Sequence, residues 1–430
     1  MSSKTPKDLL WIVPRLPWPP RCGASYANCE LVRAMADRGH RIQLICWSNE
    51  TVEVVPPEAQ RQLGVESIFV LQWPLLLRNK WTRLLISFGL QCLRRKIPLS
   101  VLPFTAGRFR ERLNQFLSRH PFTTIIWDGL HPMVIAPDKK PNDSKRINIY
   151  RAHNIEASIW RGFGRALPWP FGHVFQWQIK KMDTFERACM TYSSGIAFVQ
   201  ADDEFWFKSN VSQSAQTQLV PISVGIPADT AAWQIARWRN AQRERNDDKG
   251  ISLLWIGGLD WWPNKQAIEW FLKNIWKNVT RIRPNARLTL VGKGTERLDT
   301  VQFNNINVFG FTQDLSLVLN NADLLIVPIQ SGGGMRVKAL EALSRGVPCI
   351  GTPLGISGLP KEGLYICNDE HEWIRVISNA TPEECFIRGM MGFRAVQSQF
   401  DRAASAQRLD ELIEKCEKVS STPKMHHSTT

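Results

Sequence analysis

Three consecutive glycines form the stretch of this 430-residue chain with the clearest potential for chemistry. They are Gly332, Gly333 and Gly334, and they follow the apolar run 324–329. A backbone without Cβ atoms can approach a ligand closely, and the first N–H groups of a following helix have no partner within that helix. An anion is the natural ligand of such groups. We therefore expect a phosphate-bearing ligand here, the alternative being an ordinary strand-turn-helix connection.

Charged residues follow these glycines on a helix that we expect over 335–345, before a second apolar strand at 347–351. Arg336 and Lys338 can neutralise an anion, although at helical spacing they cannot both point into the turn. Glu341 comes about one helical turn later. Together with Arg336 and Lys338 beside the turn, it favours a phosphate-bearing ligand over an ordinary connection.

Two histidines directly follow predicted strands in the N-terminal half and are candidates for catalysis. His153 comes after the strand 145–150, and His131 comes after the turn at residues 128–130. For each, the alternative is a histidine that is buried and hydrogen-bonded for structural reasons. Glu156, three residues after His153, either orients that ring or caps the helix that starts there.

Alternating strands and helices must position these residues, and they predict an α/β protein with two Rossmann-like, doubly wound domains facing across a cleft. We expect an N-terminal domain over 1–225 and a C-terminal domain over 251–400. The charged segment 226–250, poor in apolar residues towards its end, is expected to link them. A last helix at 401–418 is expected to pack back on the N-terminal domain, followed by a disordered polar tail at 419–430.

Apolar runs define the two expected sheets. The first contains strands at 9–13, 41–47, 123–128, 145–150, 194–199 and 217–220, and the second contains strands at 252–256, 287–291, 306–309, 324–329, 347–351 and 363–367. Gly23 lies in the first strand-to-helix turn of the N-terminal domain, where such folds receive ligands.

Composition limits the partners and the compartment. There are 54 Lys plus Arg against 39 Asp plus Glu, a net charge of +15, which favours nucleotides, nucleic acid or an anionic membrane face. Nine scattered cysteines without a C-x-x-C pair indicate a reducing compartment. No apolar run reaches the roughly 18 residues of a spanning helix. We expect a cytoplasmic protein.

Residues 73–104 combine tryptophan and leucine with arginine and lysine. This pattern is typical of a helix lying in a membrane interface, and it predicts peripheral contact with the anionic inner face of a membrane. A core-packing helix with a solvated basic edge explains the same pattern.

Sequence motifs now give the pattern a family. The C-terminal half contains, in order, LLWIGGLDWWPNKQAIEWF, LTLVGKG, VFGFTQDL, GGGMRVKALEA, GVPCIGT and GISGL. This series resembles the donor-binding domain of family 4 retaining glycosyltransferases, which have the GT-B fold and move a sugar from a nucleotide diphosphate. In the N-terminal half, PWPPRCGASYANCELVRAMADRGH resembles the family's first loop, and YRAHNIEASIW resembles the histidine-asparagine-x-glutamate motif of a polysaccharide-building branch.

The resemblance implies a role for each candidate residue. It implies a donor diphosphate site at Gly23, Gly258, Lys265, Gly333, Gly334, Met335, Arg336 and Lys338. Glu341 would bind the donor ribose, and Lys293 would lie near the base or the diphosphate. His153 matches the family's histidine that contacts the donor sugar near the reacting bond. His131 is expected in the acceptor pocket.

Two positions depart from the family pattern. Gly333 stands where many members carry the first glutamate of an E-x7-E motif, so the donor sugar cannot be inferred from it. Gly258 stands where many members carry an arginine, and Lys265 can supply the missing charge. The chain lacks a D-x-D motif, so we expect no metal and a leaving group stabilised by basic side chains.

We therefore expect a retaining glycosyltransferase that moves a sugar from a nucleotide-diphosphate sugar to a saccharide, lipid-linked or polysaccharide hydroxyl. We expect no cofactor besides this co-substrate, and no nucleic-acid partner. One alternative is a nucleotide-sugar epimerase of the same fold, although the acidic and histidine residues for its elimination chemistry cannot be located. The other alternative is a non-catalytic basic module that binds a membrane or nucleic acid.

Overall fold

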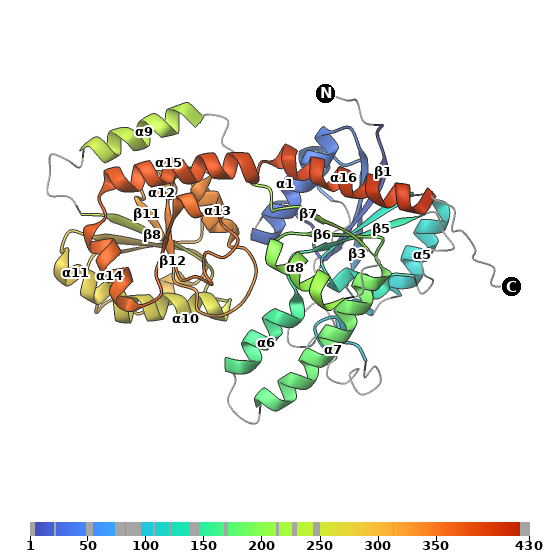
Figure 1. Cartoon of the computed structure of the whole chain (residues 1–430), viewed down its shortest axis with the longest axis horizontal. Helices are drawn as coiled ribbons and strands as arrows, with labels where there is room; N and C mark the ends of the chain where they lie inside the picture. The colour runs from blue at the N-terminus through green and yellow to red at the C-terminus, as the bar shows by residue number, and fades with distance from the viewer. Residues whose placement is uncertain are drawn as a thin grey trace. The chain divides into compact units, whose positions relative to one another are not determined.

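The computed structural model of the chain forms two compact units, each built around one parallel sheet (Figure 1). The N-terminal unit contains residues 1–222 and 402–430, and the C-terminal unit contains residues 223–401. The structure describes residues 5–20, 23–48, 55–73, 82, 96–105, 108–120, 122–137, 146–166, 171–211, 215–225, 230–243, 250–312 and 314–421.

A seven-stranded parallel sheet forms the centre of the N-terminal unit, in the order β3-β2-β1-β4-β5-β6-β7. Its strands are β1 Asp8–Val13, β2 Arg41–Ser48, β3 Ser67–Gln72, β4 Thr124–Asp128, β5 Ile147–Ala152, β6 Gly195–Phe198 and β7 Gln216–Leu219. Central strands such as β1 are buried on both faces, which explains why they read as continuous apolar runs in the sequence. The order turns at β1 and β4, and their carboxyl ends lie where doubly wound sheets bind ligands.

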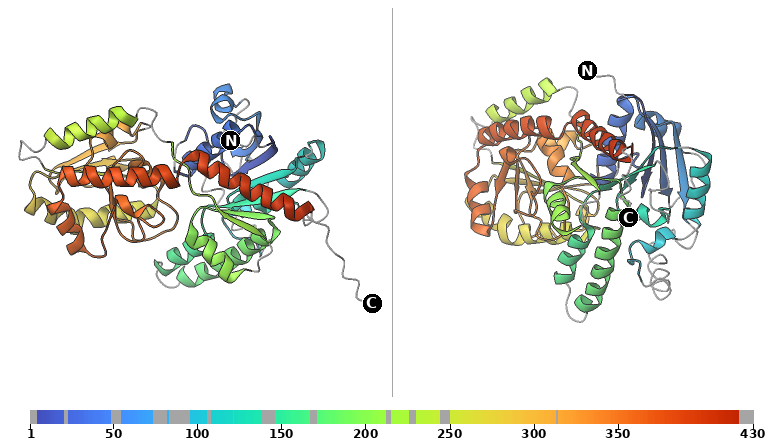
Figure 2. Two further views of the ribbon diagram at one scale, coloured as in Figure 1. Left: turned by 45° about the horizontal axis from the view of Figure 1, so that its top comes forward. Right: turned by 45° about the vertical axis from the view of Figure 1, so that its right-hand side comes forward.

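Helices cover this sheet, and two of them, α6 and α7, lie side by side as a pair (Figure 2). The helices of the unit are α1 Gly23–Asp37, α2 Pro57–Leu63, α5 Phe109–Arg119, α6 Glu156–Ala166, α7 Phe171–Tyr192, α8 Ala201–Asn210 and α16 Arg402–Ser421, with short 3-10 turns η1 Leu102–Thr105 and η2 His131–Ile135.

The last helix, α16, packs on the N-terminal sheet although the whole C-terminal unit precedes it in the chain. It contacts α1 and strands β5, β6 and β7. A Cβ atom at Gly195 of β6 would come within 2.7 Å of Cys416 Sγ, so the strand and the helix approach too closely for any side chain there. Asp410 on the buried face of α16 is 1% exposed and lies 2.6 Å from Arg38 Nε and 2.8 Å from His40 Nε2.

We expect Asp410→Ala to lower the free energy of unfolding of this unit by about 1.5–3 kcal/mol, because it leaves the buried His40 imidazole and the partly exposed Arg38 guanidinium without their carboxylate. Burial alone would raise the pKa of Asp410, but His40 and Arg38 outweigh it and the pKa lies below the ordinary value of 3.8. The contribution is therefore complete above about pH 4 and is lost as the pH falls through the pKa of the folded state. Urea unfolding of the unmodified protein and of Asp410→Ala at pH 7 and pH 3 measures the loss of stability and its dependence on pH.

Glu417→Ala is the matched control on the same helix. Glu417 pairs with Lys7 at 2.5 Å but is 38% exposed, so its removal should cost at most about 1 kcal/mol. Equal losses for the two variants would contradict the role assigned to Asp410.

The C-terminal unit has a six-stranded parallel sheet in the order β10-β9-β8-β11-β12-β13. Its strands are β8 Ser252–Ile256, β9 Arg287–Val291, β10 Ile306–Gly310, β11 Leu324–Val327, β12 Cys349–Gly351 and β13 Leu364–Ile366. Its helices are α9 Thr230–Arg243, α10 Trp262–Trp270, α11 Lys277–Ile282, α12 Ser316–Asn320, α13 Val337–Leu343, α14 Glu370–Asn379 and α15 Pro382–Gln399, with a π-helical turn η4 Phe271–Trp276 and 3-10 turns η5 Thr295–Arg297 and η6 Lys361–Gly363. The expected fold class of two doubly wound α/β domains is confirmed.

The segment expected to be an exposed linker, 226–250, instead contains the helix α9, which lies along α15 (Figure 1). One face of this helix is buried, and it carries an apolar and a charged side chain one turn apart, Trp233 and Arg237. Trp233 is 8% exposed and packs edge-on against Phe393, with ring centroids 5.4 Å apart. Arg237 Nη1 donates to the carbonyls of Leu319 and Ala322 at 2.8 and 2.9 Å, at the end of α12. Because the segment is charged overall, its sequence did not indicate that one face of this helix is buried.

The segment predicted to contact a membrane lies largely outside the described residues. Of the basic, tryptophan-rich stretch 73–104, residues 74–81 and 83–95 lie outside them, as do residues 422–430 of the expected tail. Trp73 itself is buried against Trp47 and Phe104. Among the described helices, none combines the length and the apolar character needed to cross a membrane.

Candidate functional site

The glycine-rich turn leaves the carboxyl end of β11, a central strand of the C-terminal sheet. Gly332 and Gly334 have φ values of +97° and +84°, which glycine adopts without strain. The middle residue, Gly333, offers its carbonyl to Arg336 Nη1 at 2.9 Å. This hydrogen bond joins the Arg336 side chain to the turn and so links residues 333–336.

The helix after the turn starts later than expected and is short. It begins at Val337, not at residue 335, and ends at Leu343. Arg336 has φ −83° and ψ 87°, which is not helical, because its side chain folds back to the turn. Side chains and turn amides, more than the dipole of a two-turn helix, must therefore provide the attraction for an anion.

Arg336 has unused hydrogen-bonding capacity. Its Nε and Nη2 atoms are buried and have no partner among the described residues. Burial lowers the pKa of Arg336 to about 10, so the group remains charged at neutral pH. The edge formed by Nε and Nη2 is the one that binds a phosphate or carboxylate through two parallel hydrogen bonds. Because both atoms are closed off from solvent, an oxyanion reaches them only after a local shift of the covering groups.

The loop after β8 and the start of α10 contact this turn. The ring of Trp261 lies 5.3 Å from the Arg336 guanidinium, and Ser331 Oγ donates to Gln266 Oε1 at 3.0 Å. Gly258, expected at the diphosphate, is fixed in this loop because Asn264 Nδ2 donates to its carbonyl at 3.0 Å. The structure thus brings Gly258 and its loop together with the glycine-rich turn.

Glu341 and Lys338 form an ion pair on α13. Lys338 Nζ lies 2.9 Å from Glu341 Oε2, and the two side chains are 38% and 13% exposed. Lys338 therefore points along the helix towards Glu341, and only Arg336 of the two cations contacts the turn. One carboxylate oxygen of Glu341 takes this bond, and its other lone pairs are left for a ligand.

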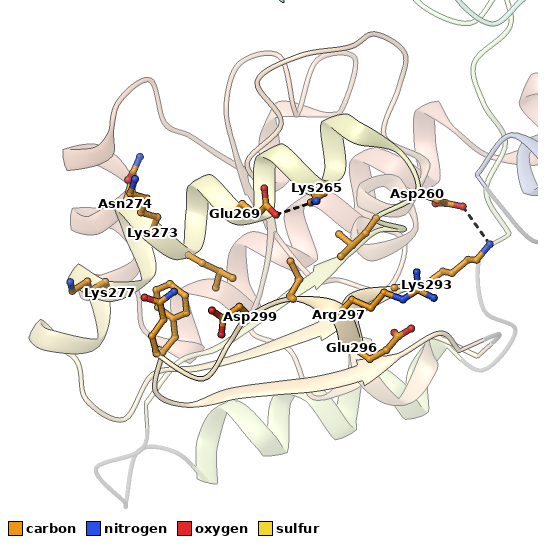
Figure 3. Close-up of a pocket in the computed structure, with 16 residues that line it drawn as sticks. Asp260, Lys265, Glu269, Lys273, Asn274, Lys277, Lys293, Glu296, Arg297 and Asp299 are labelled. Atoms are coloured by element: carbon orange, nitrogen blue, oxygen red, sulfur yellow. Dashed lines mark ion pairs between the residues drawn. The ribbon is translucent and has the colours of Figure 1, made fainter.

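A pocket of about 960 Å³ lies beside the start of α10, and Figure 3 shows its charged rim. Lys265 and Lys293 both line it, together with apolar side chains such as Leu259 and Phe303. Lys265 lies 3.8 Å from Glu269, and Lys293 lies 3.6 Å from Asp260; all four side chains are more than half exposed. The residues of the glycine-rich turn do not line this pocket, so the expected lysines and the turn flank the same loop from different sides.

In the N-terminal unit, His153 lies just beyond the end of β5 and contacts Asp128, the last residue of the neighbouring strand β4. The contact joins His153 Nε2 to Asp128 Oδ1. The histidine side chain is 22% exposed, while the aspartate is fully buried. One edge of the imidazole is therefore held inside the protein while the ring still reaches the surface.

Two further side chains contact Asp128, and a third, Asn28, holds one of them. Trp11 Nε1 donates to Oδ2 at 2.7 Å, and Arg151 Nη1 lies 3.2 Å from the same oxygen and 2.6 Å from Asn28 Oδ1. Burial alone would raise the pKa of Asp128, but Arg151, His153 and Trp11 together lower it to about 2. The carboxylate is therefore ionised at neutral pH.

The remaining expected residues of this unit lie at the same edge of the sheet. His131 starts the turn η2 after β4 and packs 5.6 Å from the ring of Phe104. Burial and Arg15 lower its pKa to about 4, so it is neutral at pH 7. Gly23 is the first residue of α1. Glu186, rather than Glu156, caps α6, because it accepts the N–H groups of Glu156 and Ala157 at 2.9 and 3.1 Å.

Asp128 and Arg151 are the site residues that sequence reasoning missed. Each is a charged residue at the end of a strand that is otherwise apolar, TIIWD and INIYRA, and both are fully buried. A charged group placed there needs a partner on the next strand. Within the described residues, no group of three His, Cys, Asp or Glu side chains is arranged to hold a metal ion.

Part of the C-terminal unit matches a known protein family. Residues 250–381, which include the glycine-rich turn and the loop after β8, match the family model of glycosyl transferases group 1. An uncharacterized 44.6 kDa protein in the cps region of Klebsiella pneumoniae is 24% identical over 176 residues, which are 37% of this chain and 45% of that protein. The match thus spans less than half of that relative.

Solved structures share the whole fold. HepE of Anabaena in complex with UDP has a TM-score of 0.63 at 11% identity, covering 95% of this chain and 100% of that one. The same protein in complex with UDP-glucose has a TM-score of 0.59 at 12% identity, covering 95% and 99%. WaaG, a glycosyltransferase involved in lipopolysaccharide biosynthesis, has a TM-score of 0.56 at 14% identity, covering 96% and 100%. The C-terminal unit therefore contains a region that matches group 1 glycosyl transferases, and the chain as a whole has the GT-B fold of these solved structures.

Proposed function

We propose that this protein transfers a sugar from a nucleotide-diphosphate sugar to a hydroxyl group of a saccharide, a lipid-linked saccharide or a polysaccharide, with retention of the anomeric configuration. A uridine diphosphate sugar is the first donor to test, because the similar HepE structures contain UDP and UDP-glucose. The match to a protein of a cps region supports a role in building a polysaccharide.

The observation that carries the proposal is Arg336 at the glycine-rich turn. A buried guanidinium edge without an acceptor is costly, and a phosphate group would satisfy both of its free N–H donors. In the proposed site, Gly333, Gly334 and Met335 contact the diphosphate through their backbone. Gly258 borders it from the loop after β8, while Lys265 on α10 and Lys293 in the turn after β9 add positive charge from the other side of that loop. Glu341 accepts the ribose hydroxyls.

The leaving diphosphate is stabilised in this mechanism by backbone N–H groups and positive side chains, and the edge of Arg336 becomes available when its covering groups shift on donor binding. His153 is the proposed catalytic residue of the N-terminal unit and contacts the donor sugar near the bond that breaks. The acceptor hydroxyl attacks from the face that the diphosphate leaves. His131 contributes to the acceptor pocket, and Gly23 lies against the diphosphate.

We expect UDP and UDP-glucose to raise the thermal unfolding midpoint by several degrees, whereas uridine and UMP, which lack the second phosphate, shift it much less. A ligand at about a hundred times its dissociation constant stabilises the folded state by about 2.7 kcal/mol. Differential scanning fluorimetry against the uridine, guanosine, adenosine and cytidine diphosphates identifies the base. No shift with any nucleoside diphosphate would overturn the proposed function.

Transfer distinguishes the enzyme from an epimerase of the same fold. A transferase releases the nucleoside diphosphate faster when a suitable saccharide acceptor is added, whereas an epimerase converts the donor sugar without one. Coupled detection of UDP from UDP-glucose, with and without a panel of saccharide acceptors, measures the difference.

A further inference from the structure

We infer that Asp128 is the positioning residue of His153: it fixes the proton on Nε2 of the imidazole and so presents Nδ1 to the substrate. The inference rests on the proposed function for its consequence in catalysis, but its structural content can be tested without any reaction. It concerns the cluster of Asp128, His153, Arg151 and Trp11 at the carboxyl ends of β1, β4 and β5.

All hydrogen-bond donors around Asp128 converge on one carboxylate. Trp11 Nε1 and Arg151 Nη1 can only donate, and they lie 2.7 and 3.2 Å from Oδ2. His153 Nε2 contacts the other oxygen, Oδ1, which also lies 3.3 Å from Arg151 Nη1. An ionised carboxylate only accepts hydrogen bonds, so the His153 nitrogen that faces it must carry a hydrogen.

This arrangement determines the tautomer of His153. With the hydrogen on Nε2, the other nitrogen, Nδ1, holds the lone pair of the neutral ring and accepts a hydrogen bond from a hydroxyl group. No protein group among the described residues bonds to Nδ1. The imidazole is 22% exposed, so the ring remains within reach of a ligand while Asp128 is closed off from solvent. Asp128 therefore acts through His153 and does not itself touch the substrate.

Backbone contacts hold the two strand ends in register. Asp128 and Arg151 are direct neighbours in the parallel pairing of β4 and β5, and Gly129 N donates to the Arg151 carbonyl at 3.1 Å. Gly129 has φ +90°, a conformation that favours glycine, so the chain turns sharply immediately after the carboxylate. The distance between Asp128 and His153 is thus determined by the sheet and not by a loose loop.

Asp128→Asn provides a sharp test because the asparagine amide has only one orientation that fits its neighbours. Trp11 donates to the Oδ2 position, and Arg151 Nη1 lies 3.2 Å from Oδ2 and 3.3 Å from Oδ1, so the amide oxygen takes the Oδ2 position beside Trp11 and the amide NH2 faces His153 Nε2. That nitrogen then becomes an acceptor, and the hydrogen moves to Nδ1. The substitution keeps the size of the side chain but reverses the tautomer, as a carboxylate-to-amide change beside a catalytic histidine is known to do.

Nitrogen-15 NMR of protein containing labelled histidine measures this directly, with the His153 signals assigned by their loss in His153→Gln. We expect Nε2 to carry a hydrogen in the unmodified protein and to lose it in Asp128→Asn. The inference would be overturned if Nε2 of the unmodified protein held a lone pair instead of a hydrogen. This result does not depend on the folding of Asp128→Asn. An unchanged tautomer in a folded Asp128→Asn would also overturn the inference.

Kinetics test the consequence. With UDP-glucose as donor, we expect Asp128→Asn to lower kcat by about a hundredfold or more while KM for the donor changes by less than about threefold. Trp127→Phe is the matched control: it removes a buried hydrogen bond from the adjacent residue of β4, Trp127 Nε1 to Asn148 Oδ1 at 3.1 Å, without touching His153. We expect it to keep the tautomer and to change kcat by less than about threefold.

The NMR measurement of the tautomer and the kinetic measurement together distinguish a failure of the positioning role of Asp128 from a failure of the proposed function. The expected tautomers together with no release of UDP by the unmodified protein would support the positioning role and count against the proposed function. Normal turnover of UDP-glucose by a folded Asp128→Asn whose tautomer has reversed would overturn the catalytic consequence of the positioning role and leave the proposed function intact.

Discussion

Glu341→Ala is expected to raise KM for the nucleotide sugar, and Kd for UDP, by at least about a hundredfold. The Glu341 carboxylate is 13% exposed, so hydrogen bonds to it are only weakly contested by water. Hydrogen bonds to a charged group contribute about 1.5–3 kcal/mol each, and two ribose hydroxyls therefore account for at least about 3 kcal/mol. This energy corresponds to more than two powers of ten in affinity. Isothermal titration with UDP measures it in the absence of an acceptor.

Glu341→Gln separates binding from packing. The amide keeps the shape of the side chain and one acceptor oxygen but loses the charge, so its affinity should fall between those of the unmodified protein and the alanine variant. Glu370→Ala, an exposed carboxylate at the start of α14, should leave UDP binding unchanged. If UDP binds to Glu341→Ala as tightly as to the unmodified protein, Glu341 does not bind the ribose.

Lys338 needs a different interpretation after the structure. Its position two residues after Arg336 suggested a contact with the diphosphate, but its ammonium group pairs with Glu341 at 2.9 Å. The pair orients the carboxylate and removes one of its acceptor sites at the same time. The proposed site therefore places Lys338 beside the carboxylate that is expected to accept the ribose hydroxyls.

Every strand of the two sheets except β3 could be predicted from apolar runs, because buried parallel strands are apolar on both faces. The run Leu9 to Val13 is an example, since all five side chains are fully buried. β3 escaped prediction because it is an edge strand with only partly buried residues, and Phe69 is 39% exposed. Helix α9 escaped it because its sequence is charged overall, and only its packing on α15 and α12 shows which face is buried.

Site residues could be predicted only where a local sequence pattern identifies them. Glycines at 332–334 indicated a turn, and two of them have positive φ. The partner of His153 could not be found in this way, because Asp128 is 25 residues earlier and meets it only through the pairing of β4 with β5. The start of α13 depended on a side-chain contact, Arg336 to the Gly333 carbonyl, that no local pattern specifies.

His153→Ala is expected to lower kcat by about a hundred- to a thousandfold while raising KM for the donor by less than about fivefold. A positioned histidine at the reacting bond acts mainly in the transition state, and its loss typically costs factors of this size. The ring is partly exposed and joined to the protein core through one buried carboxylate, so its removal leaves Asp128 still paired with Arg151 and Trp11. The fold should therefore survive, and circular dichroism checks it.

His131→Ala is the informative comparison, because it removes the other histidine at the same edge of the sheet. With a pKa near 4, His131 is neutral at pH 7 and offers shape and one hydrogen bond, not a charge. We expect its loss to raise KM for the acceptor and to leave the release of UDP into water without acceptor nearly unchanged. His153→Ala should depress both reactions. Steady-state kinetics with and without acceptor therefore assign the two histidines, and equal behaviour of the variants would count against a catalytic role for His153.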